Sequence, residues 1–139
     1  MISDNSLMCP DAFVNGNWVG GARFAVTDPA TGKTVAQVAK LDAAGARAAV
    51  DAADAAFPGW AAALPQERAA VLHRWFHLIR EAREDLARIM TAEQGKPLSE
   101  SRGEIDYAAS FVEFYAEEAK RPNIESVTSH LSTAEMELW

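Results

Sequence analysis

Residues 103–111 read Gly103-Glu104-Ile105-Asp106-Tyr107-Ala108-Ala109-Ser110-Phe111, in the middle of a helix predicted over residues 98–120. At 100° per residue, apolar side chains cover well over half of this helix. The arc combines a stripe of mostly small residues with three aromatic residues beside it: Ile105, Ala108, Ala109, Val112, Ala116 and Ala119, then Tyr107, Phe111 and Phe114. Such a helix needs cover on two sides. Two interpretations stay open: it is the central helix of a small bundle, or a covering partner lies outside these residues.

Two further helical regions are predicted before this one. The first spans about residues 42–57, with Asp42 as its N-cap and Pro58-Gly59 as its end. The second spans about residues 65–91, as one helix or two in series, and ends before Gly95. Its apolar side chains fall on half of the circumference and nearly all its charges, with Arg83 the exception, fall on the other half, so it is expected to bury one face.

Short alternating runs before the helices predict β-strands. We predict a small antiparallel meander with strands near residues 13–19, 24–27 and 34–38. The sequence thus predicts a mostly helical α+β fold, a meander followed by about three helices. The expected organisation is a flexible tail over 1–12, a folded part over 13–121 (meander 13–40, helices 42–120) and an extended tail over 122–139, where 127–131 and 134–139 are candidate strands.

The composition predicts a thin core and excludes some partners. Of the 139 residues, 28 are alanine, whereas Leu, Ile, Val and Phe together number 29, close to the level below which chains tend to be disordered. The formal net charge of −7 argues against a nucleic-acid or anionic-membrane partner. The absence of a long apolar run and the single cysteine, Cys9, favour a cytoplasmic protein.

Residue spacing alone predicts no catalytic, cofactor-binding or nucleotide-binding site. Cys9 lies in a polar segment without a local base, which makes it a poor nucleophile. His73 and His77 have metal-ligand spacing, but they lie on the polar arc beside arginines, so surface histidines are the favoured interpretation. The acidic clusters are interpreted as solvated helix faces: Glu81, Glu84 and Asp85, and Glu100, Glu104 and Asp106.

Six short motifs, in order, resemble the start of the NAD(P)-dependent aldehyde dehydrogenases. They are Phe13-Val14-Asn15-Gly16-Asn17-Trp18-Val19, Asp28-Pro29-Ala30-Thr31-Gly32-Lys33, Ala52-Ala53-Asp54-Ala55-Ala56-Phe57-Pro58-Gly59-Trp60, Pro65-Gln66-Glu67-Arg68-Ala69, Thr91-Ala92-Glu93-Gln94-Gly95-Lys96-Pro97-Leu98 and the opening 103–111 motif. The last is most similar to the succinate-semialdehyde dehydrogenase branch. The resemblance implies the outer, N-terminal part of a Rossmann-type cofactor domain, and the rest of that domain would cover the second side of the 98–120 helix.

The same resemblance implies peripheral roles for three residues. Tyr107 and Phe111 are expected to face the substrate entrance. Glu93 is expected to help hold a monovalent cation against the backbone near Val26 and Thr27. Plain packing for Tyr107 and a surface position for Glu93 are the alternatives.

The family's catalytic motifs do not occur in this sequence. Its Pro-Trp-Asn turn, Gly-rich nucleotide loop, general-base glutamate and nucleophilic cysteine motif are all absent. The parent enzyme is expected to oxidise an aldehyde to a carboxylic acid with NAD or NADP, whereas this chain alone is expected to be inactive and to bind no cofactor. Its expected partners are the remainder of the dehydrogenase chain or its subunits, with a small aldehyde as the parent's substrate.

Two features leave other interpretations open. Residues 121–127 depart from the usual continuation of the succinate-semialdehyde branch, which leaves the aldehyde undecided, along with the oligomerisation strands that follow in the family. A different class of function is a small acidic helical module that binds a partner protein through the 98–120 helix and the tail. A truncated gene product without catalysis is the third interpretation.

Overall fold

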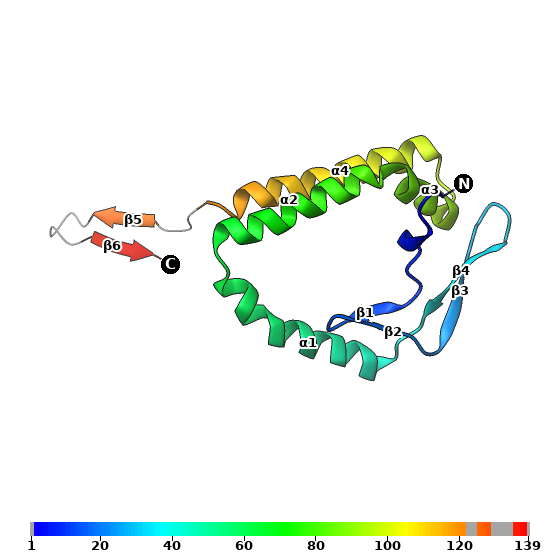
Figure 1. The fold of residues 1–139 in the computed structure, drawn as a ribbon, viewed down its shortest axis with the longest axis horizontal. Helices are drawn as coiled ribbons and strands as arrows, with labels where there is room; N and C mark the ends of the chain where they lie inside the picture. Colours follow the sequence, from blue (N-terminus) through cyan, green and yellow to red (C-terminus); the bar gives the residue numbers. More distant parts are fainter. Residues whose placement is uncertain (1, 122–124, 129–134, 139) are drawn as a thin grey trace.

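Antiparallel strand pairs followed by helices make up the computed structural model, which describes residues 2–121, 125–128 and 135–138 (Figure 1). This arrangement confirms the predicted mostly helical α+β fold. In chain order the elements are a 3₁₀ turn η1 (Asn5–Leu7), β1 (Ala12–Val14), β2 (Asn17–Val19), β3 (Arg23–Thr27), β4 (Thr34–Ala39), α1 (Ala43–Ala62), α2 (Pro65–Glu81), α3 (Arg83–Gln94), α4 (Leu98–Glu118), β5 (Glu125–Thr128) and β6 (Glu135–Leu138).

The first four strands form two separate hairpins in place of the single meander that the sequence predicted. β1 pairs with β2, and β3 pairs with β4 in another two-stranded sheet. The difference arises at Asn15 and Gly16, whose φ angles of 49° and 77° form a tight turn inside the predicted first strand. Two consecutive residues with positive φ are typical of the two-residue hairpin turn.

The helix ends follow local signals at most positions. Asp42 caps α1 as predicted, because its Oδ1 accepts a hydrogen bond from the Gly45 backbone N–H at 2.9 Å. The predicted end of α1 at Pro58-Gly59 is wrong, since the helix continues to Ala62. A proline inside a helix removes one backbone donor, and the alanines and tryptophan that follow are compatible with helix. The region after α1 consists of two helices in series, α2 and α3, and the second ends at Gly95 with φ 76°.

The small core lies where α4 packs against α2 and α3. In Figure 1, α2 and α4 run side by side, and α1 lies apart from them. The buried apolar residues of the described chain are Ala69, Ala87, Ile105, Ala109 and Ala116. Four of these five are alanines, so the helices approach closely but bury little apolar surface. The stripe predicted for α4 is confirmed at Ile105, Ala109 and Ala116, whereas Ala108 is exposed.

The aromatic side of α4 is uncovered by any other part of the described chain. Tyr107 is 65% exposed, Phe111 46% and Phe114 56%. Large apolar side chains of the other elements are exposed as well, among them Phe13, Trp18, Phe57, Trp60, Val71, Trp75 and Leu78. The described residues therefore supply one of the two covers that the wide apolar arc requires, which argues against a self-sufficient bundle.

The C-terminal strands β5 and β6 form an antiparallel hairpin in which Val127 faces Met136. They overlap the two candidate strands predicted over 127–131 and 134–139, but residues 129–134 and 139 lie outside the described residues. Within the described part of the chain, no helix combines the length and the apolar character that crossing a membrane requires.

Candidate functional site

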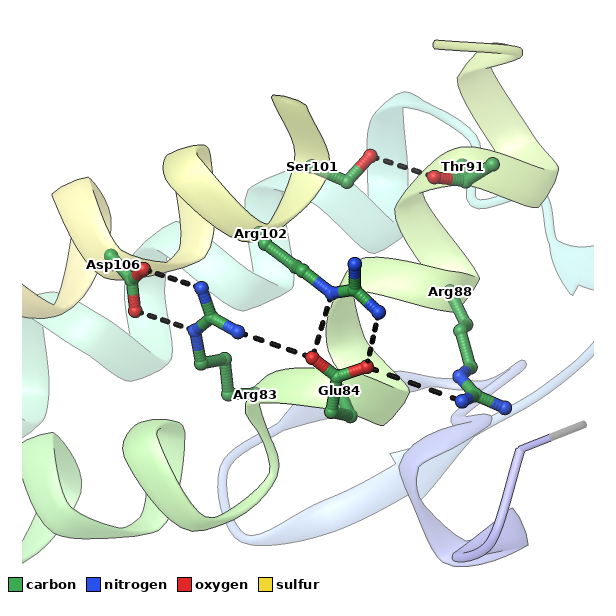
Figure 2. A network of polar contacts seen from close by, with 7 residues as sticks. All are labelled: Arg83, Glu84, Arg88, Thr91, Ser101, Arg102 and Asp106. Carbon is green, nitrogen blue, oxygen red and sulfur yellow. Dashed lines mark hydrogen bonds and ion pairs between the residues drawn. The ribbon is translucent and has the colours of Figure 1, made fainter. Parts of the chain in front are cut away.

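Charged side chains gather where α3 begins and α4 runs alongside it (Figure 2). The Arg83 guanidinium donates from Nε and Nη2 to the two carboxylate oxygens of Asp106, each at 2.7 Å. This bidentate bond holds the pKa of the Asp106 carboxyl below its usual value. Arg83 was the one charge on the apolar half of its helix, and its position is explained by this partner on α4.

Glu84 forms the second half of this network. It accepts from Arg102 Nε at 2.8 Å and Nη2 at 2.9 Å, and from Arg83 Nη1 at 3.1 Å. Arg88 Nη2 lies 4.0 Å from Glu84 Oε2. The Arg102 hydrogen bonds, followed by the nearby guanidinium charges, lower the pKa of Glu84. Glu84 and Asp106 therefore join two helices through ion pairs, while their side chains stay 47% and 42% exposed to solvent.

Asp85, next to Glu84, binds the N-terminal segment. Asp85 is nearly buried, with 8% of its surface exposed. Its carboxylate accepts the Ser3 backbone N–H at 2.9 and 3.0 Å and the Asp4 backbone N–H at 2.8 Å. The interpretation of Asp85 as a solvated acid is therefore wrong. Helical periodicity carries no signal for a contact with a backbone 82 residues away, and so sequence reasoning missed it.

A part-buried pair of hydroxyl groups fixes the other end of the α3–α4 contact. Thr91 Oγ1 and Ser101 Oγ lie 2.8 Å apart, and Ser101 is fully buried. Together with the Arg83–Asp106 and Glu84–Arg102 pairs, this bond fixes the rotation of α4 about its own axis. The two aromatic residues predicted for the site lie on this fixed helix.

Tyr107 and Phe111 form an exposed aromatic pair one helical turn apart. Their ring centroids are 4.8 Å apart with an interplanar angle of 81°, an edge-to-face contact. Both lie on the uncovered side of α4, immediately after the anchored Asp106. The structure thus brings them together on an accessible apolar surface, and their place at a substrate entrance stays a prediction.

Glu93 lies exposed near the end of α3 and lines a cavity of about 370 Å³. The other walls are Ile89 of α3, Ala36, Gln37 and Val38 of β4, and Leu7, Met8, Cys9 and Pro10 before β1. Among the residues that the structure describes, no group of three or more His, Cys, Asp or Glu side chains could hold a metal ion. A cation role for Glu93 would rest on backbone oxygens and stays a prediction.

The remaining candidate side chains have structural contacts. His73 of α2 and Glu117 of α4 approach to 2.9 Å, and Lys120 lies 2.6 Å from the other Glu117 oxygen. The lysine, followed by the histidine, lowers the pKa of Glu117. Cys9 is exposed, and its Sγ donates to the Ser6 carbonyl at 3.3 Å. The His73–Glu117 contact joins α2 to α4, whereas the Lys120 and Cys9 contacts are local in the sequence.

Residues 18–138 match the sequence profile of the aldehyde dehydrogenase family. The chain belongs to the aldehyde dehydrogenase family. Among its relatives, this aldehyde dehydrogenase chain is 48% identical over 132 residues to glutarate-semialdehyde dehydrogenase of Pseudomonas putida, covering 93% of this chain and 28% of that one. It is 46% identical over 132 residues to the NADP(+)-dependent succinate-semialdehyde dehydrogenase GabD of Escherichia coli, covering 93% and 27%.

The fold of this aldehyde dehydrogenase chain is also found in a solved structure. A crystal structure of an NADP-dependent enzyme of E. coli matches with a TM-score of 0.89 and 46% identity, over 94% of this chain and 28% of the other. These findings confirm the resemblance inferred from the six motifs, including its succinate-semialdehyde branch. The chain spans a little over a quarter of the length of the relatives it matches.

Proposed function

We propose that this chain is the outer part of a semialdehyde dehydrogenase, which oxidises an aldehyde to a carboxylic acid with NAD or NADP. The observation that carries the proposal is the uncovered aromatic side of α4. It is supported by the 46–48% identity of this chain to the matching segment, a little over a quarter of the length, of two semialdehyde dehydrogenases. A surface this apolar is expected to be covered in the complete enzyme. The remainder of the dehydrogenase, as further chain or subunits, is the partner that supplies this cover.

We assign the described residues no part in binding the nicotinamide cofactor. Arg83 and Arg102, which could bind a phosphate, are held bidentately by Asp106 and Glu84. The part of the reaction assigned to this chain is therefore positioning. The ion-pair network orients α4, and Tyr107 and Phe111 would then form an apolar wall at the entrance through which a small aldehyde reaches the catalytic residues of the remainder.

A hybrid enzyme tests this function. In it, this chain replaces the matching 132 residues of E. coli GabD. The hybrid is expected to oxidise succinate semialdehyde with NADP, and this chain alone is expected to show no turnover, as measured by NADPH absorbance. A hybrid that folds and assembles without activity would contradict the proposal, as would turnover by the chain alone.

The entrance role predicts a selective change in substrate affinity. In the hybrid enzyme, Tyr107→Ala and Phe111→Ala are expected to raise KM for the aldehyde about three- to tenfold, because each removes apolar contact with the entering substrate. The value of kcat is expected to stay within about twofold. The matched control is Phe114→Ala, another exposed aromatic residue of α4. Equal effects at Phe114 and Tyr107 would assign all three to packing.

The cation role of Glu93 has a separate test. Replacing Glu93 with Gln in the hybrid enzyme is expected to remove a stabilisation by K⁺, because the side chain loses its charge. The measurement compares the thermal unfolding midpoint in potassium chloride with that in choline chloride at equal ionic strength. Glu100→Gln, an exposed acid of α4, is the control. An unchanged K⁺ effect in Glu93→Gln would eliminate this role.

The exposed side of α4 also favours a second function, binding of a separate dehydrogenase subunit. This function predicts complementation in trans. Co-expression of the chain with E. coli GabD lacking its matching segment would then restore activity, and the two polypeptides would purify together. Activity of the hybrid enzyme without complementation in trans would favour the first function.

A further inference from the structure

Residues 2–10, here called the N-terminal strap, connect the start of the chain to β1. In Figure 1 the strap is dark blue and runs from the end of the molecule occupied by α3 toward β1. It contains the 3₁₀ turn η1, capped by Asp4, whose Oδ1 accepts the Ser6 backbone N–H at 2.8 Å. This segment was predicted to be part of a flexible tail.

Polar contacts attach the strap at both ends. At its start, the Asp85 carboxylate accepts the backbone N–H groups of Ser3 and Asp4. At its other end, the Pro10 carbonyl accepts the Ala39 backbone N–H at 2.8 Å. The first attachment joins the strap to α3, and the second joins it to the end of β4.

The middle of the strap buries little surface. Within the strap, residues 3–6, 9 and 10 are exposed, and Ile2, Leu7 and Met8 are half-buried. The strap forms one wall of the cavity that also contains Glu93, and Leu7 lines a second cavity, about 390 Å³, over the junction between α2 and α3. Because apolar burial contributes in proportion to the area removed from water, the strap depends mainly on its polar attachments.

Asp85 is the stronger attachment because it is an ionised acceptor. The Ser3 and Asp4 N–H groups, followed by the nearby charge of Arg88, lower the pKa of its carboxyl despite its burial. Hydrogen bonds to a charged group contribute about twice as much as those between neutral groups. Removing either the charge or the N–H donors is therefore expected to detach the start of the strap.

We propose that Asp85 fastens the N-terminal strap across the α2–α3 junction, and that this carboxylate determines whether the strap closes the cavity against β4. The observations are the close contacts of a nearly buried carboxylate with Ser3 and Asp4, and the low burial of the strap itself. When these hydrogen bonds break, residues 2–9 can move away from α3, while the hydrogen bond between the Ala39 N–H and the Pro10 carbonyl still holds the end of the strap. Val38 and Ile89, which line the cavity, then become accessible.

The test removes the bond from each side in turn. Asp85→Asn removes the charge from α3, and Ser3→Pro removes a donor from the strap without changing any α3 side chain. In the hybrid enzyme, each substitution is expected to accelerate hydrogen exchange of the Ser6–Cys9 amides about tenfold or more. The double variant is expected to add little, since both changes break the same contact. Asp54→Asn, an exposed aspartate of α1, is the control and is expected to change nothing.

Chymotrypsin cleavage after Leu7 provides a second measurement, and it is expected to become faster in the same two variants. Unchanged exchange and cleavage in Ser3→Pro would overturn the proposal, even if Asp85→Asn fails to fold. Effects that add fully in the double variant would also overturn it. Both readouts are independent of turnover, so an inactive hybrid enzyme would count against the proposed function without counting against the strap.

Discussion

Replacing Gly95 with alanine is expected to destabilise the fold by about 3 kcal/mol, the sum of an unfavourable backbone conformation and a steric clash. Gly95 ends α3 with φ 76°, in the left-handed region that residues with a Cβ adopt at a cost. An alanine Cβ would also lie 2.7 Å from Pro29 Cγ in the turn between β3 and β4. This substitution therefore tests the contact between the helical part and the strand pair.

The turn that carries Pro29 is poorly able to move away. Asp28 accepts hydrogen bonds from the Ala30 backbone N–H and the Thr31 hydroxyl, both at 2.8 Å. These bonds lower the pKa of the Asp28 carboxyl, the Thr31 bond most. A rigid proline ring on a closed turn cannot absorb the clash by rotating a side chain.

Gly103 provides the matched control for Gly95. It lies within α4, and a Cβ added there would meet nothing within 4 Å. Gly103→Ala is expected to stabilise the helix by about 0.5–1 kcal/mol. The measurement is the unfolding midpoint of the hybrid enzyme, which should fall for Gly95→Ala and rise slightly for Gly103→Ala. Equal midpoints for the two variants would contradict both the backbone strain expected at Gly95 and its contact with Pro29.

The isolated 139-residue chain is expected to be helical but to lack a cooperative thermal transition. Among the described residues, the buried apolar ones are four alanines and Ile105, whereas the large aromatic ones are mostly exposed. Such a core buries too little area to offset the conformational entropy of ordering the chain. Far-ultraviolet circular dichroism should therefore show helix with a broad, shallow melt, and the dye ANS should bind to the exposed apolar surface.

The hybrid enzyme is the control for this experiment, because it supplies the missing cover to the same residues. It should melt cooperatively and bind little ANS. The substitution Phe111→Glu is expected to affect the isolated chain and the hybrid enzyme differently. The substitution is expected to change the isolated chain only slightly, since Phe111 is already solvent-accessible there, and to destabilise the hybrid enzyme clearly. A cooperative, high-melting isolated monomer would contradict this account of α4.

Local signals predicted the helices well and the tertiary contacts poorly. The Asp42 cap, the Gly95 end and the buried stripe of α4 follow from neighbouring residues, so spacing revealed them. Pro58 was misread because a proline favours a helix end without requiring one. The first strand was misread because residues 13–19 were predicted as one strand, whereas the Asn15-Gly16 turn divides them into β1 and β2.

The charged contacts of the candidate site lay beyond sequence reasoning for a geometric reason. Arg83 and Asp106 are 23 residues apart, and Asp85 and Ser3 are 82 apart. A helical wheel shows which side a carboxylate occupies but not which segment meets it. One signal was present, because Arg83 was out of place on an apolar face, and such a residue should be assigned a partner. The wide apolar arc of α4 was a second signal, since its aromatic side chains lie exposed in the described structure.

The fluorescence of the exposed tryptophans can report whether other parts of a dehydrogenase cover this chain. Trp18 lies on β2, Trp60 on α1 and Trp75 on α2, and all three are about half exposed. Indoles in water emit at longer wavelengths than indoles in apolar surroundings. Joining the chain to the remainder of a dehydrogenase should therefore shift its emission to the blue. Single Trp→Phe variants would then show which of these three elements the remainder of the dehydrogenase covers.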